Sequence, residues 1–131
     1  MTMEKQSLRS PLGRAIGLGS AKEGVEHWWA QRVTAAALVV LGLWFAASVA
    51  ALAGADQATV VAWLRRPLAA ILTMLTLGFV FYHTALGLQV VIEDYVHSEW
   101  ARIPSLVVVR LLCLALAVAG IFAVLRIAFG G

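Results

Sequence analysis

Three long runs of uncharged, mostly apolar residues constrain the fold of this chain more than any other feature. The runs cover 33–53, 67–92 and 104–129, and the third carries Arg110 and Arg126 near its two ends. A helix needs about 20 such residues to cross about 30 Å of hydrocarbon. Hydrophobic residues make up 62% of the chain and charged residues 13%, whereas soluble domains average about 45–50% and about 25%. We therefore expect an all-α integral membrane protein with three transmembrane helices and not a water-soluble globule.

The whole chain, residues 1–131, is expected to form one membrane domain. A polar arm over 1–31 precedes helices predicted at 32–54, 67–92 and 104–129. The arm lacks the apolar core of a cleavable signal peptide, so we expect it to be retained.

The distribution of basic residues predicts the orientation of the chain in the membrane. The arm, the second loop and the span ends next to them lie on one side of the predicted topology and carry seven of the ten Lys and Arg residues. Cytoplasmic segments are enriched in these residues, so the N-terminus is predicted inside and the C-terminus outside. The formal net charge of +3 is interpreted as this topological signal, and nucleic acid is not expected as a partner.

His83 is the most informative candidate for chemistry, because ionisable groups inside a membrane span are costly and usually functional. Two interpretations are open: a ligand of a metal or haem, or a histidine without such a role that is neutral and hydrogen-bonded to a neighbouring helix or placed at the lipid edge by helix tilt. Gly87, one turn further on, favours haem because a residue without a side chain lets a flat macrocycle approach. The single cysteine, Cys113, excludes an intrachain disulfide and all-cysteine metal sites.

A haem with two histidine ligands would need its second ligand from another chain. His27 and His97 lie at the inner ends of the predicted spans, and we leave both outside the ligand set. The haem interpretation therefore predicts an oligomer.

Polar residues at the inner membrane boundary form a second group of candidates. Asp94 follows His83 by almost three helical turns, so both lie on one helix face about 16 Å apart. Tyr95 has a phenol suited to donate a hydrogen bond to a quinone carbonyl, and Arg32 is suited to pair with an anion such as a haem propionate. The alternative is an ordinary polar helix end with an aromatic belt residue and a positive-inside anchor.

Small residues recur every four positions in the first span. This stripe favours close helix packing and consists of Gly42, Ala46, Ala50 and Gly54.

Two strings in the sequence together resemble a known family. The segment 83–96 reads HTALGLQVVIEDYV, with Asp94 and Tyr95 at positions +11 and +12 from His83, and the first span opens with QRVTA at 31–35. The chain resembles the small hydrophobic membrane anchor subunit of succinate dehydrogenase, the succinate:quinone oxidoreductase of respiratory complex II.

The resemblance implies a partner chain and a shared cofactor. The chain would pack with a second membrane anchor, a three-helix subunit of the cytochrome b type, and the two would hold one haem b with His83 as one axial ligand. Tyr95 and Asp94 would contribute to the ubiquinone site, and Arg32 would lie near the haem propionates or the quinone pocket.

The resemblance also implies soluble partners on the inner side, namely an iron–sulfur subunit and a flavoprotein subunit. Succinate would be oxidised on the flavoprotein, so this chain would have no dehydrogenase active site of its own. Its place would be in the tricarboxylic acid cycle and aerobic electron transport. The short arm differs from the long Arg- and Ser-rich presequence of an imported protein, which favours a bacterial inner membrane over the mitochondrial one.

Three alternatives stay open from the sequence. They are a haem-free anchor or assembly subunit, a small transporter component, and a fumarate reductase anchor that uses menaquinone. The transporter is disfavoured because Glu93 and Asp94 lie at a span boundary, whereas transporter sites usually lie near the midplane.

Overall fold

The computed structural model describes residues 22–130, and this part of the chain is helical with no strand. The helices are α2 (Lys22–Ala51), α3 (Gln57–Leu64), α4 (Pro67–Tyr95) and α5 (Glu99–Ala128). Three of them, α2, α4 and α5, are long and apolar enough to cross a membrane. The predicted all-α fold with three spans is confirmed, whereas most of the predicted arm lies outside the described residues.

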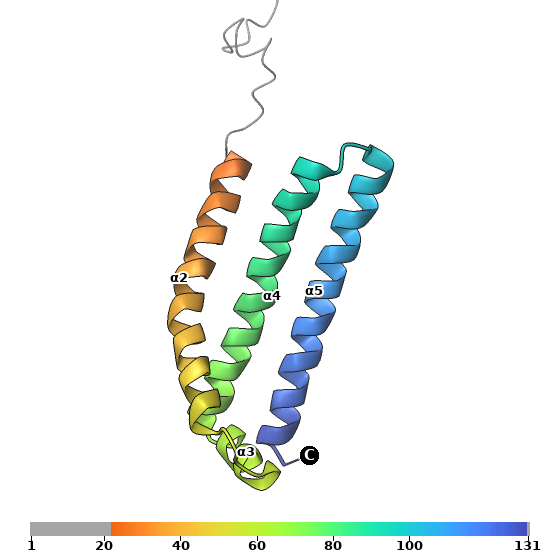
Figure 1. Ribbon diagram of the computed structural model, residues 1–131. Coiled ribbons are helices and arrows are strands. Elements are labelled where there is room, and N and C mark those ends of the chain that lie inside the picture. Colours follow the sequence, from red (N-terminus) through yellow and green to blue (C-terminus); the bar gives the residue numbers. More distant parts are fainter. Residues whose placement is uncertain (1–21, 131) are drawn as a thin grey trace, which may run out of the picture.

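The three long helices run antiparallel in a single row, with α4 in the middle packed against both α2 and α5 (Figure 1). Along the helix axes, the start of α2 and the turn between α4 and α5 lie at one end of the bundle. Helix α3 and the end of α5 lie at the opposite end. The described chain therefore begins and ends on opposite sides of the row, as an odd number of spans requires.

At the end of the bundle where α2 begins, the helices extend past the uncharged runs from which the spans were predicted, whereas α2 ends at Ala51 and α5 at Ala128, short of the residues at which those runs end. α2 begins ahead of residue 32, α4 continues past residue 92 to Tyr95, and α5 begins at Glu99, with Pro104 inside it. A charged residue ends an apolar run but not a helix, because its backbone hydrogen bonds continue into the interfacial region.

The short helix α3 was not predicted from the sequence. Asp56 caps it by accepting a hydrogen bond from the Thr59 amide at 2.9 Å, which satisfies one of the unpaired N–H groups of the first turn. Hydrogen bonding from Thr59 also holds the pKa of the Asp56 carboxyl below its ordinary value. The cap therefore contributes stability at neutral pH that is lost only as the pH falls through this lowered pKa.

Two contacts fix α3 beneath the row. Trp63 stacks on Trp44 of α2 with ring centroids 5.9 Å apart and planes inclined by 21°. Arg65 donates from Nε to the Ile127 carbonyl at 3.3 Å, where a cation near a helix C-terminus is favourable. Trp44, which lies within the predicted first span, thus packs against the loop helix.

The core of the row is thin and consists largely of small residues. Its buried members are Thr34, Leu41, Ala69, Ala70, Thr73, Thr76, Cys113 and Val124. Many large apolar side chains are exposed on both outer helices and on α4. In a water-soluble monomer such surface is unusual, whereas lipid or another apolar chain covers it without cost.

Within residues 22–130, the α2 part of the small-residue stripe, Gly42, Ala46 and Ala50, does not pack against another helix. Ala46 and Ala50 are exposed, and a Cβ atom added at Gly42 would meet open space. The stripe faces away from α4 and is left for a neighbour outside the chain or for lipid.

Candidate functional site

His83 lies on the face of α4 that packs against α2, and its ring is half-buried. The Nδ1 atom lies 2.8 Å from the hydroxyl oxygen of Thr34, which is 3% exposed. Thr34 also donates back along its own helix to the Ala30 carbonyl at 2.7 Å, with the Gln31 carbonyl at 3.1 Å. The hydrogen bond to a neighbouring helix, which was one of the two interpretations of His83, is therefore present.

The other ring nitrogen of His83, Nε2, makes no hydrogen bond within residues 22–130 and is not among their buried unpaired atoms. The two interpretations of this histidine are thus compatible, because one nitrogen fixes the ring and the other stays available. No group of three or more potential metal-ligating side chains occurs in the described residues. A metal at His83 would need its remaining ligands from outside this part of the chain.

Polar side chains continue along the same face of α2 toward the N-terminal end of that helix. His27, Gln31 and Thr34 are spaced by four and three residues, which places them on one side of a helix. His27 Nε2 and Gln31 Oε1 are buried and have no hydrogen-bond partner within the described residues. We call the line formed by these three residues and His83 the polar seam.

Gly87 also faces α2, but the space above it is not open. A Cβ atom added there would lie 3.6 Å from Nε2 of Gln31, an ordinary van der Waals contact. The glycine therefore brings the Gln31 amide close to α4, an arrangement that the sequence did not predict.

Asp94 and Tyr95 lie at the C-terminal end of α4, whereas Arg32 lies ten residues into α2, next in sequence to Gln31, which lies against Gly87. All three are exposed, Tyr95 at 79%. Asp94 shares the helix face of His83 by its spacing, and Tyr95 is turned about 100° further around the axis. None of the three makes a hydrogen bond or an ion pair with His83 in the part of the chain described.

Arg32 and His97 have partners of their own. The guanidinium of Arg32 lies over the ring of Trp28, 5.1 Å from its centroid. His97 Nδ1 lies 3.1 Å from the Tyr95 carbonyl, so it contacts the turn after α4 and not the polar seam.

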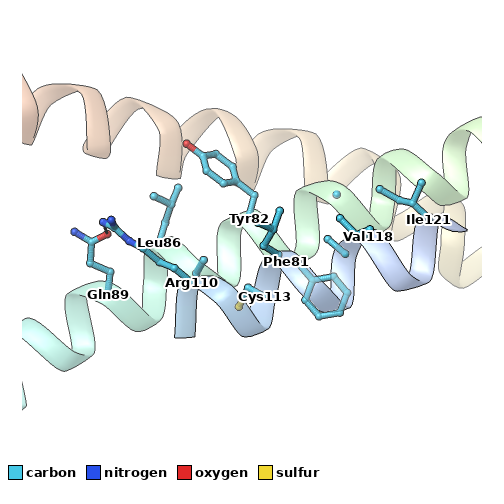
Figure 2. Close-up of a pocket in the computed structure, with 12 residues that line it drawn as sticks. Phe81, Tyr82, Leu86, Gln89, Arg110, Cys113, Val118 and Ile121 are labelled. Atoms are coloured by element: carbon cyan, nitrogen blue, oxygen red, sulfur yellow. Dashed lines mark hydrogen bonds between the residues drawn. The ribbon is translucent and has the colours of Figure 1, made fainter. Parts of the chain in front are cut away.

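A second polar group lies between α4 and α5 and was missed in the sequence. Arg110 donates to Oε1 of Gln89 at 2.7 Å, and Gln89 donates to Oε1 of Glu93 at 2.8 Å. Figure 2 shows Arg110 reaching Gln89 at one end of a groove of about 500 Å³, with Phe81 and Ile121 in its apolar part. Arg110 and Gln89 are 21 residues apart in the sequence, and their pairing depends on how α4 and α5 are aligned.

The three long apolar helices define a multi-pass membrane protein. Within the described residues, its intramembrane histidine, His83, is hydrogen-bonded at Nδ1 and has no hydrogen-bond partner at Nε2, so Nε2 is available to bind a ligand. Comparison with known proteins assigns the family. The chain belongs to the succinate dehydrogenase/fumarate reductase transmembrane subunits, whose family model matches residues 6–124.

Curated relatives agree with this assignment. The chain is 36% identical to the succinate dehydrogenase hydrophobic membrane anchor subunit of Rickettsia bellii over 88% of this chain and 93% of the relative. It is 33% identical to the subunit of the same name from Paracoccus denitrificans over 92% of this chain and 93% of that one. The succinate dehydrogenase membrane anchor subunit of Reclinomonas americana is 34% identical over 71% of this chain and 80% of the relative. No solved structure matches the model.

Proposed function

We propose that this chain anchors a succinate:ubiquinone oxidoreductase in a bacterial inner membrane and holds one haem b together with a second membrane anchor. The observation that carries the haem proposal is the state of His83, fixed at Nδ1 with Nε2 free of partners in the described residues. A haem b would supply a one-electron redox centre between the polar seam and the partner chain. The relatives are named as succinate dehydrogenase anchors, which favours succinate oxidation over fumarate reduction with menaquinone.

The row of helices supports the proposal of a partner anchor. A haem with two axial ligands needs a second imidazole or equivalent, and the described residues offer none beside His83 at that depth. The outer faces of the row are apolar and exposed, as expected for a surface that another helical subunit covers. The iron–sulfur and flavoprotein subunits would dock at the end of the helices that carries Asp94 and Tyr95.

The quinone proposal rests on the position of Tyr95. Its phenol is exposed at the end of α4, where an amphipathic quinone head group meets water. Tyr95 would donate a hydrogen bond to the quinone carbonyl, and the neighbouring Asp94 would orient the phenol or accept and release protons as the quinol forms. Arg32, stacked on Trp28, would present its guanidinium to a propionate or to the quinone pocket.

Replacing His83 tests the haem proposal most directly. The complex is purified in mild detergent on a tag carried by this chain, and its reduced-minus-oxidised visible spectrum is recorded. We expect a low-spin haem b band in the unaltered complex and its loss in His83→Ala, because the remaining ligand alone binds iron weakly. His97→Ala is the matched control and should keep the band, because within the described residues the His97 side chain hydrogen-bonds to the Tyr95 carbonyl and not to the polar seam. An unchanged band in His83→Ala would remove His83 from the ligand set.

Replacing Tyr95 tests the quinone site separately. Tyr95→Phe keeps the ring and removes the hydrogen-bond donor, which is worth about 1 kcal/mol, or severalfold to tenfold in rate. We expect succinate-dependent reduction of a ubiquinone analogue to fall by that factor, with haem content unchanged. Reduction of an artificial electron acceptor by the flavoprotein is the control and should not change. Normal ubiquinone turnover in Tyr95→Phe would contradict the assignment.

A further inference from the structure

The hydroxyl of Thr34 has one proton to donate and three neighbours that could receive it. Two of them, the carbonyls of Ala30 at 2.7 Å and Gln31 at 3.1 Å, can only accept. The third is Nδ1 of His83 at 2.8 Å, which can donate or accept according to the tautomer. Donation to the preceding turn is the usual arrangement for a threonine inside a helix. With its proton on the Ala30 carbonyl, the Thr34 oxygen is an acceptor toward His83.

This network determines the tautomer of the imidazole. Nδ1 must then carry the proton and donate it to Thr34, so Nε2 has a free lone pair. Only that lone pair can bind a metal, because metal ligation requires an unprotonated nitrogen. The threonine is 3% exposed, so water does not compete for the hydrogen bond.

We propose that Thr34 is a positioning residue for His83: it holds the Nδ1–H tautomer, fixes the ring plane and directs Nε2 away from α2 as an axial ligand. The proposal rests on the proposed function, since it names the residue that prepares His83 for haem. A hydrogen bond accepted from the distal nitrogen also raises the basicity of the ligating nitrogen. A more basic imidazole stabilises ferric over ferrous iron, so Thr34 lowers the reduction potential of the haem.

The chain offers a matched control for this hydroxyl. Thr73 and Thr76 of α4 are buried threonines that donate to the carbonyl four residues back, each at 2.7 Å, and have no further partner in the described residues. Thr73→Val therefore removes a back-bonded hydroxyl without touching His83. Thr34→Val removes the same group together with the acceptor of Nδ1–H. Thr34→Ser restores that acceptor.

The test uses the detergent-purified complex with all its subunits. Haem content, the electron paramagnetic resonance g-values of the ferric haem and its midpoint potential are measured for the three variants. In Thr34→Val we expect haem binding to weaken about 10- to 100-fold, altered g-values because the ring is free to rotate, and a higher midpoint potential. Thr34→Ser and Thr73→Val should match the unaltered complex in all three measurements.

Each outcome decides the proposal. Loss of haem from Thr34→Val, with haem retained in Thr34→Ser and Thr73→Val, supports it even where no potential can be measured. Thr34→Val with unchanged haem content, g-values and potential overturns it, as does a Thr34→Ser complex as impaired as Thr34→Val. Failure of the proposed function is distinguishable, because haem retained in His83→Ala refutes the ligand itself, whereas haem lost in His83→Ala but unaffected in Thr34→Val refutes only the role of Thr34.

Discussion

The central helix α4 has two interfaces of opposite character. Toward α5 it packs on small and apolar residues, and the polar contact there, Arg110 to Gln89, is exposed and lies near the end of the groove. Toward α2 it buries the polar seam, in which two atoms have no partner in the described residues. The α4–α5 interface holds the helices together through apolar contacts. The α2–α4 interface contains buried polar groups, with which lipid cannot form hydrogen bonds.

This difference indicates where chemistry can take place in a chain without a catalytic pocket of its own. An unpaired buried polar atom destabilises a structure unless something pairs with it. The interface of α4 with α5 has few polar groups that could bind a cofactor, and these lie at its exposed end. The interface of α4 with α2 contains two such groups, His83 Nε2 and the amide of Gln31. We therefore assign stability chiefly to the first interface and function to the second.

Adding a side chain at Gly120, where α5 packs against Leu77 of α4, should have the largest effect on stability. A Cβ atom at Gly120 would lie 3.1 Å and 3.4 Å from the two methyl carbons of Leu77, so Gly120→Val would push the helices apart. Overpacking of this kind costs about 2–3 kcal/mol. We expect a lower melting temperature and lower yield of the purified complex.

Gly78→Val is the matched control for that experiment. It makes the same change inside a neighbouring helix at a site where a Cβ atom meets nothing within 4 Å. Equal losses in the two variants would mean that helix propensity, and not the contact with Leu77, accounts for the effect.

The three spans and the all-α fold followed from the sequence because burial in lipid requires long uncharged runs, and such runs are visible without knowledge of tertiary structure. The prediction that His83 is functional rests on the same physics and stays a prediction. The ends of the helices were harder to predict from the sequence, because Glu93 and Asp94 end the apolar run but not helix α4. The cap at Asp56 was present in the sequence, yet a helix as short as α3 depends on the stacking of Trp63 on Trp44.

The partners of His83 could not be predicted, for a different reason. Thr34 lies 49 residues away from His83, and whether the two meet depends on the rotation and the relative height of α2 and α4. Those quantities are set by many small contacts along the interface. From the sequence, Gln31 was named only as part of the QRVTA string. That its amide lies against Gly87 could be seen only once the packing of the helices was known.

Replacing Gln31 tests the interface between α2 and α4, and we expect a smaller effect on stability than at Gly120. Native buried amides are nearly always paired, so the buried Oε1 of Gln31 is expected to accept a hydrogen bond from a group outside the described residues. Gln31→Leu should then lower the melting temperature of the assembled complex by an amount that corresponds to about 1–2 kcal/mol. Gln89→Leu serves as control, because its partners Arg110 and Glu93 are exposed and within the chain, and its loss should be smaller. A complex that is equally or more stable with leucine at position 31 would show that the atom is unpaired in the assembly, and the polar seam would then end at Thr34.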